Sequence, residues 1–144
     1  MLLQQGVAAG GQGSGLLRNF LSLKGVTSVA IADPFRQRRE GAAQKVKTAQ
    51  GHDPKLYNDF RELLADPSID AVYIPLPNHL HVEWTLKAVA AGKHVLTEKP
   101  IALRADEIDR IIAARDASGL LAAEAYMIVH HPQWKRAKEW LEAG

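Results

Sequence analysis

The sequence predicts a doubly wound α/β fold, in which helices cover both faces of a mainly parallel sheet. Short apolar runs alternate with longer segments of helical period along the whole chain, as repeated strand and helix units require. A glycine-rich stretch at positions 10–15 follows the first apolar run, where a turn into a helix is expected. The 144 residues are enough for one hydrophobic core, so we expect residues 1–144 to form a single domain.

Six strands are expected at the short runs of apolar or β-branched residues. These runs are residues 2–9, 26–32, 55–57, 69–74, 94–97 and 120–124. The second run is the clearest, because Asp33 and Pro34 stop it abruptly. Strands that follow one another in this way, separated by helices, pair in parallel.

Helices are expected where apolar residues recur every three or four positions. They lie near residues 16–23, 35–46, 59–65, 78–91, 106–117 and 132–142. Gly25, Gly92 and Gly119 are expected to end three of them, because glycine adopts the left-handed conformation that closes a helix. Asn58 or Asp59 should cap the third helix, and Asn78 the fourth.

Composition excludes several classes of protein. With 47% hydrophobic and 24% charged residues, the chain should fold. Its lysines and arginines are spread along the sequence at a net charge of +2, which argues against nucleic-acid binding. It has no cysteine, no apolar stretch of transmembrane length and no basic leader before its first apolar run. We therefore expect a cytoplasmic protein without disulfides, membrane spans or a signal peptide.

The glycine-rich stretch indicates a dinucleotide site, because a strand precedes it and a helix follows. Gly10 and Gly13 take the second and third positions of the G-x-G-x-x-G pattern, and Ala8 takes the first. The alternative register, Gly10 with Gly15, lacks the middle glycine, and a plain turn from strand to helix is a further alternative. The helix N-terminus would bind a pyrophosphate through its free N–H groups. The residues of this subsite are Gly10, Gly11, Gln12 and Gly13.

Asp33 ends the second strand, 23 positions after Gly10, where an acid accepts hydrogen bonds from the adenosine ribose. That position favours NAD as the cofactor. Arg36, Arg38 and Arg39 follow, and a guanidinium here, Arg38 above all, could bind the 2′-phosphate of NADP. The same arginines could instead be a solvated helix face, so both cofactors stay open.

The loops after the fourth and fifth strands should complete the site, since ligands of such sheets bind beyond the carboxyl ends of the strands. The expected cofactor contacts are Pro75, Leu76, Asn78, His81, Glu98 and Lys99. On the alternative interpretation, Asn78 is only a helix cap, His79 and His81 are surface imidazoles, and Lys99 is a salt-bridge partner. No metal site is expected, because the two histidines lack a third ligand.

Three motifs and a later pair carry a family resemblance. The motifs are Pro77-Asn78-His79-Leu80-His81, Ala91-Gly92-Lys93-His94-Val95 and Thr97-Glu98-Lys99-Pro100, and the pair is Glu124-Ala125-Tyr126-Met127 with His131-Pro132-Gln133. Over essentially the whole chain the sequence resembles the Gfo/Idh/MocA oxidoreductases, which include glucose-fructose oxidoreductase and inositol 2-dehydrogenase. The resemblance implies an NAD(P)-binding Rossmann domain in which Lys99 is catalytic, orienting the reacting carbinol and assisting its proton transfer.

The resemblance also implies hydride transfer between NAD(P) and a secondary alcohol of a sugar or polyol. Many relatives carry arginine near Val129, and Gln4 and Gln5 are unusual in a strand buried on both faces. In the family a second domain with the substrate pocket and a catalytic histidine follows the last helix. We therefore expect this chain to lack the full active site, which leaves its status as an enzyme open.

Two other functions stay open at this stage. The chain could be a noncatalytic dinucleotide-binding module, or a protein-interaction domain that has lost its cofactor. The sheet region that meets the second domain in the family could also support a homo-oligomer.

Overall fold

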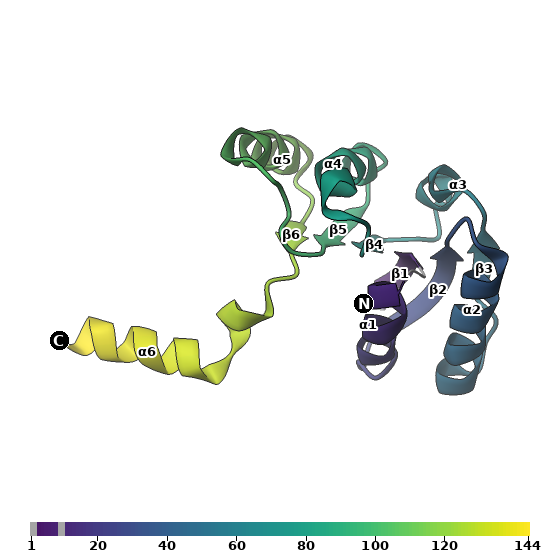
Figure 1. The fold of residues 1–144 in the computed structure, drawn as a ribbon, viewed down its shortest axis with the longest axis horizontal. Coiled ribbons are helices and arrows are strands. Elements are labelled where there is room, and N and C mark those ends of the chain that lie inside the picture. The colour runs from purple at the N-terminus through teal and green to yellow at the C-terminus, as the bar shows by residue number, and fades with distance from the viewer. Residues whose placement is uncertain (1–2, 9–10) are drawn as a thin grey trace.

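The computed structural model describes residues 3–8 and 11–144 and shows a six-stranded sheet in the order β3-β2-β1-β4-β5-β6. Every pair of neighbouring strands is parallel. Helices α1 and α2 lie on one face, and α3, α4 and α5 lie on the other (Figure 1). The predicted doubly wound architecture is confirmed.

All six predicted strands are present. They are β1 (Leu3–Ala8), β2 (Val26–Ala32), β3 (Lys55–Tyr57), β4 (Ala71–Ile74), β5 (His94–Thr97) and β6 (Ala122–Glu124). The fourth begins two residues later than predicted. Ile69, which precedes it, packs in the core without belonging to the strand. The sixth begins two residues late, and Leu121 before it is exposed.

The predicted helices are also present, with two short 3-10 turns. They are α1 (Gly11–Leu21), α2 (Arg36–Gln50), α3 (Phe60–Ala65), η1 (Asn78–Leu80), α4 (His81–Ala90), α5 (Ala105–Ser118), η2 (Met127–His130) and α6 (Pro132–Ala143). Asp59 caps α3, accepting the N–H of Arg61 at 2.8 Å. The prediction that Asn78 caps the fourth helix is wrong, because Asn78 opens η1 and α4 begins only at His81 without a side-chain cap.

Residues of β4 alternate between two cores, as the two-residue period of a strand requires. Val72 and Ile74 pack in a core with buried residues of α3 and α4. Tyr73 faces the other way and packs with Leu17 of α1 and Val46 of α2. A strand buried on both faces explains why this stretch is continuously apolar rather than alternating.

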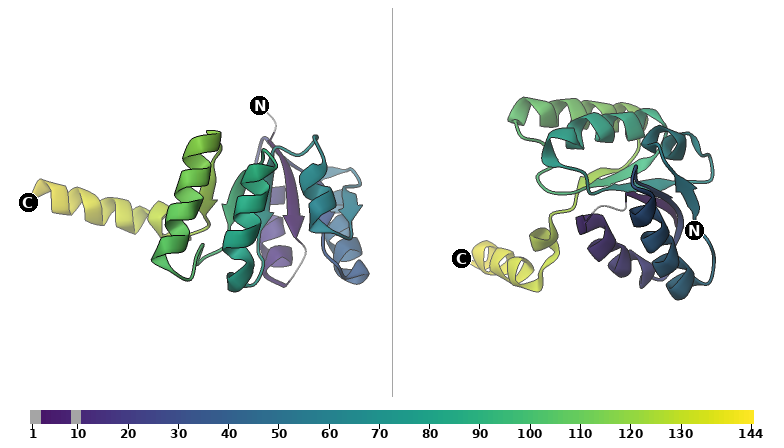
Figure 2. Two further views of the ribbon diagram at one scale, coloured as in Figure 1. Left: turned by 90° about the horizontal axis from the view of Figure 1, so that it is seen from above. Right: turned by 45° about the vertical axis from the view of Figure 1, so that its right-hand side comes forward.

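Helix α6 extends away from the sheet and is joined to it through η2 (Figures 1 and 2). Its Trp140 and Leu141 are exposed over 65% and 84% of their surfaces. Leu96, Leu121 and Ala123 help to line an apolar hollow at the β5 and β6 end of the sheet. Exposed apolar surfaces of this kind are typical of contact with further protein.

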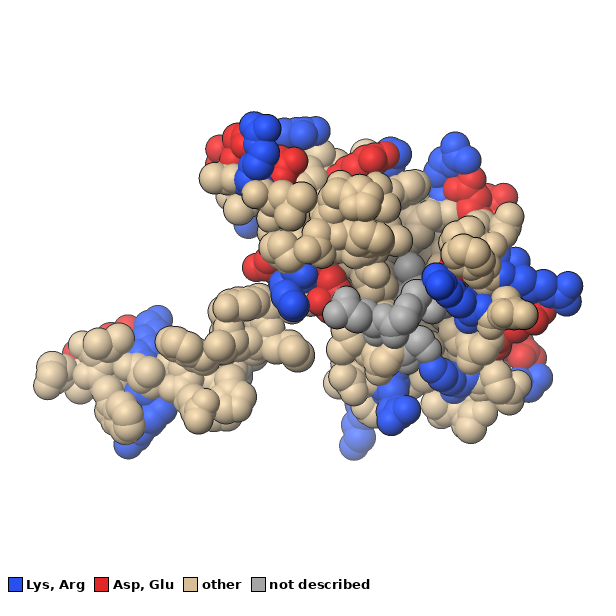
Figure 3. Space-filling view, viewed as in Figure 1, with Lys and Arg blue, Asp and Glu red and all other residues tan. Residues whose placement is uncertain are grey.

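Charged side chains are mixed over the visible surface, without a large basic patch (Figure 3). Acidic and basic groups also pair locally, as in the contact between Lys47 and Asp53 at 3.0 Å. In residues 3–8 and 11–144, no helix has the length and apolarity needed to cross a membrane.

The outer edge of β2 is closed partly by side chains. Strand β3 pairs only with the last three residues of β2, from Ala30 to Ala32. Before them, the Gln50 amide accepts the N–H of Ser28 at 2.9 Å and donates to the Val26 carbonyl at 3.0 Å. The His52 ring lies 3.0 Å from the Ser28 carbonyl. Backbone groups that lack a neighbouring strand thus find side-chain partners.

Asp66 joins the segments around β3, α3 and β4. Its carboxylate accepts Lys55 Nζ and the Tyr57 hydroxyl, both at 2.7 Å, and the N–H and hydroxyl of Ser68. The buried Lys93 ammonium donates to the Asp66 carbonyl at 2.7 Å and to the Ile69 carbonyl at 2.8 Å. The bonds that the Asp66 carboxylate accepts, first from Lys55 and then from Tyr57 and Ser68, hold the pKa of the Asp66 carboxyl well below its ordinary value.

We predict that Asp66→Asn lowers the free energy of unfolding at neutral pH by about 2 kcal/mol, because a neutral amide cannot replace the charged acceptor. A carboxyl with a lowered pKa stabilises the fold above its ordinary pKa of 3.8, and that contribution is lost as the pH falls below it. Urea titrations should therefore show wild type and variant converging as acid is added. Asp53→Asn, at an exposed ion pair, is the control and should leave stability unchanged. Equal effects of the two changes would contradict the central role of Asp66.

Candidate functional site

The candidate site lies at the carboxyl edge of the sheet, where β1, β2, β4 and β5 end. Strands β1 and β4 are neighbours, and the chain continues from β1 toward β2 and β3 but from β4 toward β5 and β6. Doubly wound sheets bind their ligands at such a reversal.

The first helix begins at Gly11, directly after the first strand. Its first turn contains no acidic residue, so no carboxylate competes for the N–H groups there. The predicted Gly10 contact lies outside the described residues, as does the Gln12 side chain. In the alternative register, Gly15 takes the place of Gly13. A Cβ added at Gly15 would meet no protein atom within 4 Å, so packing within the protein does not require glycine there.

Asp33 lies at the end of β2 with its side chain almost fully buried. One carboxylate oxygen accepts the N–H of Phe35 at 2.8 Å, which fixes the direction of the group. The other oxygen lies 4.0 Å from Arg38 Nη1. Asp33 therefore presents a fixed acceptor at the edge, where the ribose contact was predicted.

The three arginines after Asp33 have different environments. Arg36 faces solvent and pairs with Glu40 at 2.7 Å, as the interpretation of a solvated helix face requires. Arg39 is occupied by the Asp33 carbonyl at 2.5 Å and by Asn58 Oδ1 at 2.8 Å. Arg38, the arginine favoured above for the 2′-phosphate, lies over the Phe35 ring, 4.5 Å from its centroid.

The loop after β4 places its predicted residues at different depths. Pro75 and Leu76 are half-buried, whereas Asn78 and His79 are exposed. His81 is fully buried, which contradicts the alternative interpretation of a surface imidazole. Its ring nitrogens lie 2.7 Å from the Leu76 and Pro100 carbonyl oxygens. Across the described ranges, no group of three or more acidic or histidine side chains could hold a metal ion.

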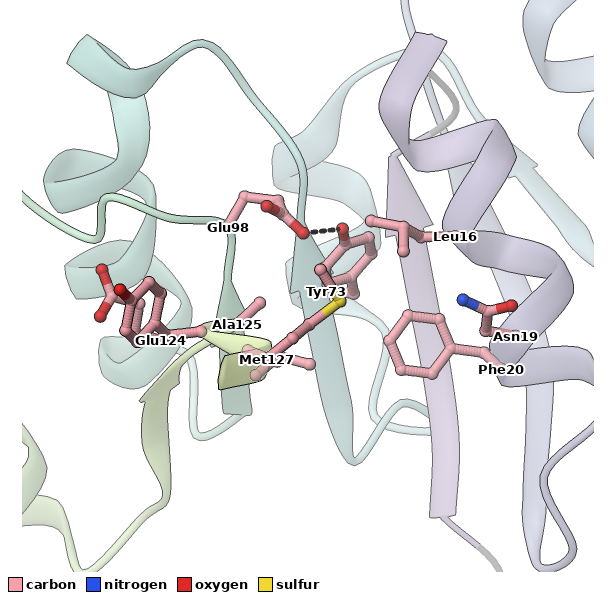
Figure 4. Close-up of a pocket in the computed structure, with 10 residues that line it drawn as sticks. Leu16, Asn19, Phe20, Tyr73, Glu98, Glu124, Ala125 and Met127 are labelled. Atoms are coloured by element: carbon pink, nitrogen blue, oxygen red, sulfur yellow. Dashed lines mark hydrogen bonds between the residues drawn. The ribbon is translucent and has the colours of Figure 1, made fainter. Parts of the chain in front are cut away.

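Glu98 is buried at the end of β5 and is held from inside the domain (Figure 4). The Tyr73 hydroxyl donates to its Oε1 at 2.6 Å, and the Lys99 N–H donates to its Oε2 at 3.3 Å. Burial, and then the bond to Glu98, raise the pKa of the Tyr73 phenol well above its ordinary value. Tyr73 thus stays a hydrogen-bond donor and orients the carboxylate.

Lys99 directly follows Glu98, and its side chain is exposed at the edge of the sheet. Within the described part of the chain, no acidic side chain forms an ion pair with its ammonium. The loop beyond it is anchored by Glu124 of β6, which accepts the Ile101 N–H at 2.8 Å. The salt-bridge interpretation of Lys99 therefore finds no support, and the ammonium is available to a ligand.

A cavity of about 280 Å³ opens beside Glu98, between α1 and the segment after β6 (Figure 4). Its lining includes Phe20 of α1, Tyr73 of β4 and Met127 of η2. Sequence reasoning missed Tyr73 and Glu124. A phenol inside a strand buried on both faces is a usable signal for Tyr73, because its hydroxyl requires a partner. Glu124 stands in one of the quoted family motifs, but nothing in the sequence indicates its partner, a backbone N–H in another loop.

The comparisons agree with this arrangement. Residues 6–126 match the Gfo/Idh/MocA family, described as an oxidoreductase family with an NAD-binding Rossmann fold. The chain is 44% identical over 129 residues to an uncharacterized oxidoreductase of Rhizobium meliloti, a match that covers 90% of this chain and 37% of that protein. It is 45% identical over 108 residues to D-xylose 1-dehydrogenase (NADP(+)) 2 of Haloferax volcanii, covering 75% and 33% of the two chains.

Solved structures show the same fold. A 3-ketoreductase from Actinomadura kijaniata in complex with NADP and TDP-benzene matches with a TM-score of 0.88 and 29% identity. That match covers 100% of this chain and 43% of the ketoreductase. A scyllo-inositol dehydrogenase from Lactobacillus casei matches in fold, with a TM-score of 0.86 at 22% identity. The chain thus spans less than half the length of these relatives.

We predict that Tyr73→Phe lowers the free energy of unfolding by about 1–2 kcal/mol, because Oε1 of the buried Glu98 carboxylate loses the hydrogen bond from the Tyr73 hydroxyl. Tyr126→Phe, at an exposed phenol lining the same cavity, is the matched control and should have no effect. Urea unfolding of both variants checks this, and a neutral Tyr73→Phe would contradict the assigned bond.

Proposed function

The chain belongs to the Gfo/Idh/MocA oxidoreductase family and matches its NAD-binding Rossmann domain, so we propose that it binds the cofactor of a hydride-transfer reaction. The chain binds NAD or NADP for a reaction at a secondary alcohol of a sugar or polyol. The observation that carries this proposal is that a helix N-terminus without an acidic residue, the Asp33 acceptor and the Lys99 ammonium lie along one sheet edge, and that no described acidic side chain pairs with this ammonium.

The residues at this edge fit a dinucleotide. The N–H groups of the first turn of α1 suit the pyrophosphate, because that turn carries no acid. The Asp33 carboxylate, held by the Phe35 N–H, suits the hydroxyls of the adenosine ribose. Pro75, Leu76 and Asn78 lie in the loop after β4, next to the Glu98 and Lys99 corner, where the other half of the cofactor would lie.

Lys99 is the residue that we assign to the reaction. The nicotinamide, when bound, supplies the hydride chemistry, and the protein positions and polarises the reactants. The exposed Lys99 ammonium would hold the substrate hydroxyl and help to move its proton, while Glu98 keeps the Lys99 backbone in place through its Oε2. The groups that select a particular sugar would come from the part of the relatives that this chain does not span.

Asp33 favours NAD, because a carboxylate next to a 2′-phosphate is repelled. Arg38 is the group that could admit NADP, but it lies 4.0 Å from Asp33 and over the Phe35 ring. The names of the Haloferax volcanii enzyme and the Actinomadura kijaniata structure specify NADP, and that of the Lactobacillus casei structure specifies NAD(H). We propose NAD as the preferred cofactor, and a cytoplasmic location in keeping with the absence of cysteine.

We predict that calorimetric titration shows weak binding of NAD to the wild-type chain. Asp33→Asn should weaken NAD binding by about tenfold, because a charged acceptor of the ribose bonds becomes neutral. The matched control, Asp53→Asn, lies away from the sheet edge at an exposed ion pair and should bind NAD as wild type does. Arg38→Ala should weaken NADP binding more than NAD binding. The absence of heat with both nucleotides would refute the proposal and favour an interaction domain.

We also predict that the chain alone does not turn over a panel of polyols and sugars with NAD or NADP. Lys99→Ala should leave nucleotide affinity within about threefold of wild type, because Lys99 is one of several proposed cofactor contacts and its ammonium is assigned chiefly to the substrate hydroxyl. Clear turnover by the wild-type chain, measured as nicotinamide absorbance, would show that this chain holds more of the active site than we propose.

A further inference from the structure

We propose that His81 is a positioning residue that ties together the two loops of the nicotinamide end of the site. Its ring lies between the Leu76 carbonyl, in the loop after β4, and the Pro100 carbonyl, in the loop after β5, at 2.7 Å from each. The inference rests on the proposed function only in taking these loops as part of the nucleotide site. It departs from the expected direct cofactor contact, because the ring is fully buried.

The chemistry of the two contacts fixes the role of the ring. A carbonyl oxygen can only accept, so the ring donates a hydrogen bond to a carbonyl wherever the nitrogen that faces it carries a hydrogen. A buried ring with both nitrogens engaged has no donor left for a cofactor, and acts by fixing the backbone around it.

The two carbonyls are well placed to control the loops. Leu76 lies between Pro75 and Pro77, whose rings restrict the backbone, so holding its carbonyl holds the short loop. Pro100 directly follows Lys99, whose own N–H is held by Glu98 on the other side. The Lys99 backbone is therefore anchored on both sides, while its side chain remains free for a ligand.

Thr85 offers a matched comparison within the same helix. It lies one turn after His81 on α4 and is equally buried. Its hydroxyl is 2.6 Å from that of Thr97 at the end of β5. The Thr85 bond therefore joins α4 to the sheet, whereas the His81 bonds join α4 to the loops. Removing the Thr85 hydroxyl tests general stability without releasing the loops.

The first experiment is amide hydrogen exchange of the chain without nucleotide, comparing His81→Phe with Thr85→Val. Phenylalanine keeps a ring in the space but donates no hydrogen bond. The Leu80 and Ile101 amides are both hydrogen-bonded in the wild type. His81→Phe should raise their exchange rates about ten times more than it raises the exchange rates of amides in the core strands. Thr85→Val should change these loop amides no more than the core. The same uniform pattern in both variants would overturn the proposal.

The second experiment examines the imidazole of the wild-type chain, so that its result does not depend on the folding of a variant. Nitrogen-15 spectra should show a hydrogen-bearing ring nitrogen of His81 with a through-bond coupling to the carbonyl carbon of Leu76 or Pro100. A ring whose hydrogen-bearing nitrogens couple to neither carbonyl would overturn the bridge.

The third experiment separates this inference from the proposed function. NAD affinity should fall by about tenfold in His81→Phe and by less than about threefold in Thr85→Val, because only the first releases the loops. If wild type binds no NAD, the proposed function fails, while the exchange and nitrogen-15 results still decide whether His81 bridges the loops. If His81→Phe speeds exchange of the loop amides but binds NAD as tightly as wild type does, the bridge exists but does not support nucleotide binding, and that part of the proposal is refuted.

Discussion

Burial of a parallel sheet on both faces is the constraint on which the rest of this structure depends. Polar groups inside such a sheet are stabilised by partners within the protein, because water cannot reach them. Thr85 therefore meets Thr97, and Tyr73 meets Glu98. Parallel pairing also sends the carboxyl end of every strand to one edge. Asp33, Glu98 and Lys99 follow strand ends and consequently lie at that edge.

The corner at Lys99 is held from both faces of the sheet. On the α1 face, Tyr73 orients Glu98, which accepts the Lys99 N–H. On the α4 face, His81 contacts the Pro100 carbonyl. An ammonium on a flexible four-carbon stem has much freedom, so precise placement of its backbone limits what the side chain can reach. The Lys99 side chain is thus exposed above a backbone that hydrogen bonds hold on both faces.

Much of the fold follows from the sequence, because β-branched runs, helical periods and the glycines at helix ends are local signals. The positions of Asp33 and Lys99 at the carboxyl edge of the sheet were also predictable, since each residue follows a strand end. The bonds of His81 and Glu124 were not, because their partners are backbone groups far along the chain, in loops whose path no local pattern specifies. Asn78 was misjudged as a cap because a 3-10 turn intervenes before the helix.

The side-chain closure at the start of β2 has a consequence for the molecule in a crowded solution. An unpaired strand edge is a template on which another polypeptide can add a strand, the first step of edge-to-edge aggregation. The Gln50 amide presents one acceptor and one donor to β2, much as a peptide group would, and His52 takes a further carbonyl. The edge strand β3 can therefore be only three residues long, and the β2 edge that it leaves uncovered still offers few backbone groups to another polypeptide.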